Sequence, residues 1–137
     1  MKFTSFLPGI IWFIISAILL TLPGNDLPHN KLFNIPFFDK YVHFTMFFML
    51  TTLFSFPFIF SGEDEAIVKA WFNKIAIYAI LYGIAMEFVQ KYFTYDRSFD
   101  FIDIVFDGLG SITGLLVLRK YSGKKIGPNR NRGRNQN

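Results

Sequence analysis

The amino-acid sequence predicts an all-α integral membrane protein: a bundle of four transmembrane helices over residues 1–121, followed by a disordered basic tail over residues 122–137. Three observations indicate this class. Hydrophobic residues make up 52% and aromatic residues 20% of the 137 residues, more than a soluble domain of this size usually carries. Four stretches with few charges have about the length of a membrane span. Half of the basic residues follow the last acidic residue, Asp107.

The first apolar stretch, residues 6–22, carries no charge and ends at Pro23 and Gly24. A spanning helix needs about 20 predominantly apolar residues, so this stretch is long enough to cross a bilayer. A cleaved signal peptide is the alternative, but the apolar run is long and no site of the A-x-A type follows it. We therefore expect a retained membrane anchor.

The second and third stretches also have the length of a span. Residues 41–61 contain His43 as their ionisable side chain apart from Tyr41. Residues 71–93 are mainly apolar, and the polar side chains that stand out in them are those of Lys74, Glu87, Gln90 and Lys91. Steps of four and three residues place Gly83, Glu87, Gln90 and Thr94 on one face, which should therefore contact neighbouring helices.

The fourth stretch, residues 101–118, is apolar but contains Asp103 and Asp107, with Asp100 just before it. An aspartate at the centre of a membrane helix costs roughly 2.5 to 3.5 kcal/mol on insertion scales, so such side chains usually face protein or water. The spacing keeps all three acids on one side of a helix. That side continues into a GxxxG pattern, which permits close approach of another helix; its glycines are Gly110 and Gly114.

The remaining segments are expected to be connections. Prolines at positions 23, 28 and 36 break helix formation between the first two stretches, and residues 61–69 form an acidic turn. Residues 122–137 are poor in apolar residues, which is typical of disorder. A basic tail beside a membrane span is explained by topology and contact with anionic lipid, so we expect no nucleic-acid partner.

Lysine and arginine residues predict the orientation. With both termini cytoplasmic, ten basic residues lie inside and four outside, as expected when cytoplasmic segments retain positive charge. We therefore expect a multi-pass protein of the cell (cytoplasmic) membrane. Because the sequence has no cysteine, disulfides, thiolate nucleophiles and cysteine metal sites are excluded.

Four alternating crossings bring the start of the second span, the end of the third and the start of the fourth to the outer side. The polar residues occur at these places, so they are expected to line one outward-facing pocket. The predicted binding residues are Asp39, Lys40, His43, Glu87, Gln90, Arg97, Asp100, Asp103 and Asp107. The candidates for catalysis are His43, Asp39, Glu87 and Asp103.

Clustered carboxylates repel one another unless Lys40 and Arg97 pair with them, one of them takes a proton, or a cation binds. The spacing of Asp39 and His43 stacks the two on one helical face, where the carboxylate can orient the imidazole. No metal site is predicted, because a single histidine among carboxylates lacks a diagnostic zinc spacing, and no cofactor is identified. The alternatives are helix capping for the interfacial residues and a hydrogen-bonded network that fixes helix register for the deeper acids.

The three motifs DKYVHF (39–44), EFVQ (87–90) and RSFDFIDIVFDGLGSITG (97–114) resemble the VanZ-like family of small membrane proteins, named for a teicoplanin-resistance determinant. The resemblance covers the chain to about residue 120. One departure is Asp107, where the family usually has asparagine. The resemblance implies a role in the cell envelope and in tolerance of a lipid-bearing glycopeptide antibiotic; it supplies no reaction.

Three functions remain open. The first is binding of a lipid or lipid-linked headgroup, with Lys40 and Arg97 holding phosphate, so that the partners are membrane lipids or lipid-linked envelope intermediates. The second is a membrane-embedded acid–base enzyme acting on a phosphate-bearing lipid. The third is a non-catalytic partner or a proton-coupled carrier, for which four spans are few unless the protein forms a homo-oligomer.

Overall fold

The computed structural model describes residues 2–22, 37–95 and 97–126, and in these ranges all regular secondary structure is helical, with no strand. A short 3₁₀ helix, η1 (Phe3–Phe6), leads into α1 (Leu7–Thr21). Three longer helices follow: α2 (Phe38–Ile59), α3 (Glu65–Phe93) and α4 (Phe101–Ile126). The prolines at 23, 28 and 36 and most of the predicted tail lie outside the described residues.

Four helices are long and apolar enough to span a membrane, which confirms the predicted all-α class and its four crossings. Two boundaries differ from the expected ones. Helix α3 begins at Glu65, where a charged first turn with a Glu65–Lys69 ion pair of 2.7 Å extends beyond the apolar stretch. Helix α4 continues to Ile126, past residue 122, where the tail was expected to begin.

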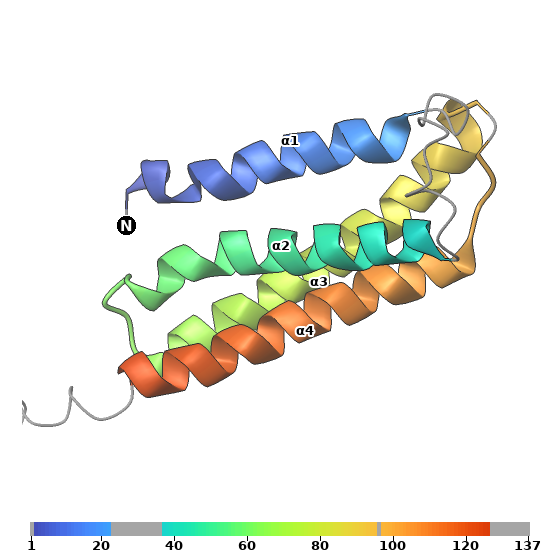
Figure 1. Ribbon diagram of the computed structural model, residues 1–137. Coiled ribbons are helices and arrows are strands. Elements are labelled where there is room, and N and C mark those ends of the chain that lie inside the picture. Colours follow the sequence, from blue (N-terminus) through green and yellow to red (C-terminus); the bar gives the residue numbers. More distant parts are fainter. Residues whose placement is uncertain (1, 23–36, 96, 127–137) are drawn as a thin grey trace, which may run out of the picture.

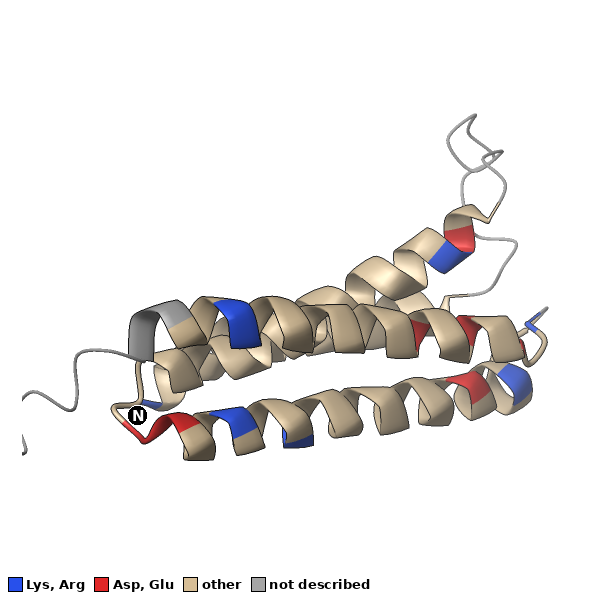
Figure 2. Cartoon of the chain, turned by 90° about the horizontal axis from the view of Figure 1, so that it is seen from below, with Lys and Arg blue, Asp and Glu red and all other residues tan. Residues whose placement is uncertain are grey.

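The helices run up and down, so that each end of the bundle collects alternate helix termini (Figure 1). We refer to the end where α1 and α3 finish and α2 and α4 begin as the polar end. Charged residues lie toward the two ends of the bundle and the middle is free of them (Figure 2). The stretch of α3 between Lys74 and Glu87 illustrates this, because it has no charged residue.

Helices α2 and α4 approach each other closely along the glycines that the sequence singled out. A Cβ atom on Gly110 would overlap the backbone of α2 at Phe44 and Phe48, and one on Gly114 would lie 3.0 Å from the Phe48 carbonyl oxygen. Only glycine fits at Gly110 without moving a helix backbone. The predicted GxxxG approach therefore takes place between α4 and α2, and it fixes the register of the two helices.

Helix α1 lies beside α2 and α3 (Figure 1), and three long-range hydrogen bonds join it to them, one of them between the Ser16 and Tyr82 hydroxyl groups. The Trp12 indole donates to the Met46 carbonyl oxygen over 3.0 Å, and the Gln90 side-chain amide donates to the Leu20 carbonyl oxygen over 2.8 Å. The opposite face of α1 is exposed and aliphatic. Such a face is typical of contact with lipid rather than water; it includes Ile11, Ile14 and Ile18.

Candidate functional site

The polar end of the bundle holds a buried group of charged side chains contributed by α2, α3 and α4. We refer to five of them as the polar cluster: Lys40, His43, Glu87, Asp103 and Asp107. Each is at most 6% exposed, which is unusual for ionisable residues and requires that they be paired. Asp39 and Asp100 lie at the rim of the cluster, with side chains 55% and 37% exposed.

The Lys40 ammonium group lies among three carboxylates. Its Nζ donates to Asp100 Oδ2 and Asp103 Oδ1, each over 2.5 Å, and lies 2.9 Å from Asp39 Oδ2. An ammonium group has three N–H donors, so these three acids use all of them. Lys40 thus neutralises carboxylates of its own chain and has no donor left for a ligand.

His43 is held from across the α2–α4 contact. Its Nδ1 lies 2.9 Å from Asp107 Oδ1, while Nε2 faces Asp103 Oδ2 at 3.8 Å, too far for a hydrogen bond. A carboxylate that accepts the Nδ1 proton leaves the Nε2 of a neutral imidazole with a free lone pair. The expectation that Asp39 orients this imidazole is wrong: Asp39 contacts Lys40, because the register of α2 against α4 brings Asp107 to His43 instead.

Glu87 is almost fully buried, and its two oxygens have different surroundings. Oε2 accepts a hydrogen bond from the backbone N–H of Asp100 over 2.9 Å. Oε1 is buried and has no hydrogen-bond partner among the described residues. A buried carboxylate oxygen without a hydrogen-bond partner lowers the stability of the fold. Oε1 is therefore a candidate contact for a ligand. Gln90, one turn further along α3, instead bonds α1, so its contact is structural.

Arg97 precedes α4 and is half-buried. Its Nε is buried without a hydrogen-bond partner, and no carboxylate of the described residues lies within ion-pair distance of its guanidinium group. Within the described part of the chain, Lys40 therefore pairs with the acids. The N–H donors of the Arg97 guanidinium group have no acidic partner there and are able to bind another group.

Asp100 combines a capping and an electrostatic contact. Its Oδ1 accepts the backbone N–H of Ile102 over 2.8 Å, so it caps the start of α4, as the capping alternative expects of an aspartate at this position. Its Oδ2 binds the Lys40 ammonium group. The hydrogen bond to Lys40 lowers the pKa of the Asp100 carboxyl, and the Ile102 N–H adds to this effect, so Asp100 is ionised at neutral pH.

Comparisons with known proteins agree with the three motifs. The model of the family described as VanZ/LLP1 matches residues 4–122. The chain belongs to the VanZ/LLP1 family. It is 34% identical over 117 residues to an uncharacterized protein of the fission yeast Schizosaccharomyces pombe. That match covers 85% of this chain and 64% of the length of the relative. No solved structure matches.

In this member of the VanZ/LLP1 family, Gly83 of α3 leaves space for the side chain of Asp107. A Cβ atom at position 83 would overlap the Asp107 carboxylate, so only a glycine lets Asp107 lie between α3 and α2. The polar stripe of α3 already included Gly83. Its contact with Asp107 could not be predicted from the sequence, because that contact depends on how two helices pack.

Three members of the cluster have the side-chain types that bind metal ions. His43, Glu87 and Asp103 each offer one nitrogen or oxygen atom, and these atoms all lie within 4.8 Å of one another. They come from three different helices, so no spacing along the sequence could indicate the set.

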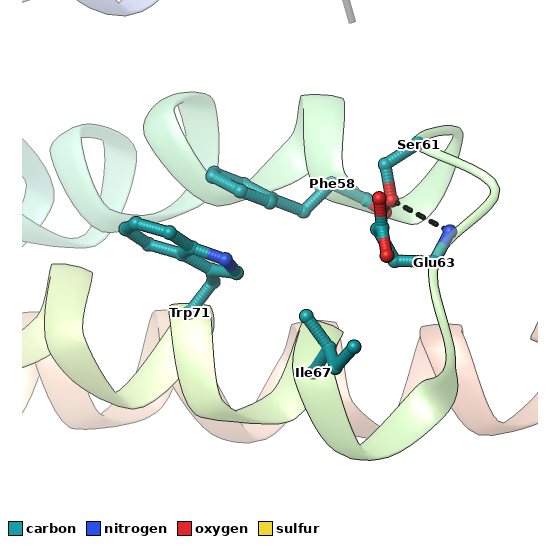
Figure 3. Close-up of a pocket in the computed structure, with 5 residues that line it drawn as sticks. All are labelled: Phe58, Ser61, Glu63, Ile67 and Trp71. Carbon is teal, nitrogen blue, oxygen red and sulfur yellow. Dashed lines mark hydrogen bonds between the residues drawn. The ribbon is translucent and has the colours of Figure 1, made fainter.

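A pocket at the opposite end of this VanZ/LLP1 chain has another character (Figure 3). It lies between the end of α2 and the start of α3, and the Phe58 and Trp71 rings stack there with centroids 5.1 Å apart. Ser61 Oγ accepts the backbone N–H of Glu63 over 3.2 Å, as in a tight turn (Figure 3). No member of the polar cluster lines this pocket, whose contacts are those of a helix–turn–helix connection.

Proposed function

We propose that the polar cluster is a membrane-embedded active site that binds the phosphate-bearing headgroup of a lipid and hydrolyses its phosphate ester or anhydride. One observation carries this proposal. His43 is oriented by Asp107 through one nitrogen, and its other nitrogen faces Asp103. A histidine held by a carboxylate on one side and free on the other is suited to proton transfer or to activating a water.

The position of the cluster supports a lipid headgroup as the ligand. The cluster lies near one end of the membrane-spanning helices, where headgroups meet the protein. Tyrosine side chains are enriched at this level of a membrane because one end of the ring is polar and the rest is apolar. Three exposed tyrosines occur at the polar end: Tyr41, Tyr92 and Tyr95.

Arg97 supports phosphate as the recognised group. A guanidinium fork donates two parallel hydrogen bonds to a phosphate, and Arg97 has no acidic partner among the described residues. The first of the three expected functions assigned Lys40 the same role. Because Lys40 is surrounded by three carboxylates, Arg97 alone keeps that role in this proposal.

Hydrolysis forms a bond between phosphorus and the oxygen of a water molecule and breaks the phosphorus–oxygen bond to the leaving group. The water gives up one proton, and the departing oxygen takes one up. In this proposal, His43, Asp103 and Glu87 surround the water; one of them receives its proton and returns a proton to the departing oxygen. Asp107 holds the imidazole in one tautomer, and Arg97 holds the phosphate.

The experiment is phosphate release by the purified protein in detergent, with polyprenyl monophosphate and diphosphate as substrates and Mg²⁺ or Mn²⁺ present. We expect release by the wild type and a loss of about 100-fold or more in His43→Ala and Asp103→Asn, since acid–base groups contribute on the order of 10² to 10⁴ in rate. The matched control is Asp64→Asn, an exposed acid at the opposite end. Absence of release from both substrates overturns the hydrolytic function.

Binding without turnover is the second candidate. The guanidinium of Arg97, which has no acidic partner among the described residues, favours it independently of His43. Native mass spectrometry would detect a retained anionic lipid. A lipid lost in Arg97→Ala but kept in His43→Ala, with no phosphate release by the wild type, establishes this function. Removal or capture of a lipid-linked envelope intermediate would then explain the glycopeptide tolerance that the resemblance implies.

In this proposal the polar end faces the outer leaflet of the cell membrane, with both termini in the cytoplasm. The opposite end carries more basic residues, as cytoplasmic ends do; these are Lys2, Lys69, Lys74, Arg119 and Lys120. At the polar end the basic residues of the described part are Lys40, Lys91 and Arg97. Reporter fusions at each terminus test the orientation, and an external signal from either terminus contradicts it.

A further inference from the structure

Three side-chain atoms of the polar cluster carry no hydrogen bond among the described residues, and each belongs to a residue whose other polar atom is bound. His43 uses Nδ1 on Asp107 and keeps Nε2. Asp103 uses Oδ1 on Lys40 and keeps Oδ2. Glu87 uses Oε2 on the backbone N–H of Asp100 and keeps Oε1. One polar atom of each side chain is thus satisfied, while the other has no hydrogen bond among the described residues.

This arrangement is the one that metal ligands adopt. A metal-binding histidine usually donates its other ring N–H to a carboxylate, and ligating carboxylates are themselves hydrogen-bonded. The Nε2 of His43 and Oδ2 of Asp103 lie 3.8 Å apart. Two ligands of one ion, each about 2.1 Å from it, lie about 3 to 4 Å from each other, so this pair already has a suitable separation.

The charge of the site also favours a cation. The site gathers five carboxylates, those of Asp39, Glu87, Asp100, Asp103 and Asp107, and among the described residues Lys40 is the one lysine or arginine that forms ion pairs with them. A phosphate entering this site would be repelled unless positive charge is added. The orphaned Oε1 of Glu87 is the separate sign of a ligand: it is buried, it belongs to a side chain that is 1% exposed, and nothing in the described chain satisfies it.

We propose that His43, Glu87 and Asp103 bind one divalent cation between α2, α3 and α4. One imidazole nitrogen and two carboxylate oxygens suit Mn²⁺ or Zn²⁺, and the small number of protein ligands leaves coordination positions for water and phosphate oxygens. The inference deepens the proposed function and rests on it for the use of the cation. With Nε2 of His43 bound to the cation, the cation and not that nitrogen would activate the water, by lowering its pKa, and it would also neutralise the phosphate. Binding of the cation itself does not require turnover.

The test is binding of MnCl₂ to the chelator-treated protein in detergent, measured by loss of the free Mn²⁺ electron paramagnetic resonance signal. We expect one Mn²⁺ per chain and a binding constant weakened more than about 100-fold in Glu87→Gln and in His43→Ala, because removing a ligand costs more than the about 10- to 100-fold that is lost with one of its outer partners, such as Asp107. Glu87→Gln keeps a carbonyl oxygen that accepts the Asp100 N–H, so it tests ligation with least disturbance of the fold.

Asp107→Asn is the matched control inside the cluster. It removes one negative charge, as Glu87→Gln does, but it keeps an oxygen that accepts the His43 N–H and it removes no proposed ligand. The proposal expects Asp107→Asn to bind Mn²⁺ clearly more tightly than Glu87→Gln. Equal weakening by both substitutions, or no binding by the wild type, overturns the site, because the acids then attract cations only diffusely.

The two proposals fail in distinguishable ways. Mn²⁺ binding that depends on Glu87, without release of phosphate from any substrate, supports the cation site and contradicts the hydrolytic function. Phosphate release that persists after removal of divalent cations, together with no Mn²⁺ binding, supports the hydrolytic function and contradicts the cation site. Circular dichroism and size-exclusion profiles equal to those of the wild type establish that each variant is folded.

Discussion

Two regions between the same pair of helices bury polar side chains, and they do so for different reasons. In the polar cluster, charged groups of α2 and α4 pair with one another. Deeper in the bundle, three buried hydroxyl groups have no hydrogen-bond partner in the described chain: those of Thr51, Ser55 and Ser111. They accompany Gly110 and Gly114 where the two backbones nearly touch. We refer to this second region as the α2–α4 seam.

The difference shows that a buried polar residue is not in itself a sign of function. In the seam, serine and threonine are small enough for close helix contact, and their hydroxyl groups contribute little. In the cluster, the side chains are long, charged and directed at one place. Substitutions that change size should therefore damage the seam, and substitutions that change charge should damage the cluster.

The largest expected effect is that of Lys40→Met. Removing the ammonium group leaves the carboxylates of Asp100 and Asp103 without a counter-charge, and breaking a buried ion pair by deleting one partner costs about 3 to 5 kcal/mol. We expect a marked fall in the unfolding temperature in detergent. Lys91→Met, at an exposed position, is the control; an equally stable Lys40→Met protein would contradict the role given to this lysine.

Arg97→Ala should affect the substrate more than the fold. A hydrogen bond to a charged group contributes about 1.5 to 3 kcal/mol, so loss of the phosphate contact should raise KM roughly 10- to 100-fold and change kcat little. Steady-state kinetics with a polyprenyl phosphate measure this. The same variant should keep its Mn²⁺ affinity, and a weakened affinity would place Arg97 in the cation site instead.

Gly110→Ala tests the seam through size alone. The added methyl group would overlap the backbone of α2 at Phe44 and Phe48, and overpacking costs about 1 to 3 kcal/mol. Gly108→Ala is a close control, because a Cβ atom at Gly108 meets nothing within 4 Å. Thermal unfolding of the two variants in detergent should separate them, with Gly110→Ala the less stable. Equal unfolding temperatures would mean that the helices are not in tight contact there.

Ser55→Ala should have the smallest effect. The hydroxyl group is buried and has no partner among the described residues, so removing it leaves no other group unsatisfied. We expect a change in stability within about 0.5 kcal/mol, as for substitutions that break no named interaction, and unchanged phosphate release. A large loss of either would show that the seam has a role beyond packing.

The length of the apolar stretches predicted the four helices. The alternating direction of the crossings predicted which helix ends lie together. The spacing of Asp100, Asp103 and Asp107 also placed the acids on one side of α4, because that relation is set within one helix. The partner of His43 was predicted wrongly for the same reason. Spacing along α2 relates His43 to Asp39, whereas the register between α2 and α4 brings Asp107 to His43.

The remaining differences also depend on neighbours. A hydropathy window stops where charges begin, so it missed the first turn of α3, whose Glu65 and Lys69 pair with each other. A hydropathy window also cannot show that all three donors of the Lys40 ammonium group are occupied by acids from two segments. Nor can it show that Glu87 accepts the backbone N–H of Asp100. Such facts appear only when side chains from different helices are seen together.

The ion pairs between α2 and α4 also bear on how the chain enters the bilayer. Taken alone, α4 would expose Asp103 and Asp107 to the bilayer, and an aspartate costs up to roughly 2.5 to 3.5 kcal/mol at the centre of a membrane helix and less toward its end. Lys40 and His43 remove that penalty only after the two helices have met. During biosynthesis α4 should therefore insert into the bilayer unfavourably by itself. Its insertion should depend on α2 being already in the membrane.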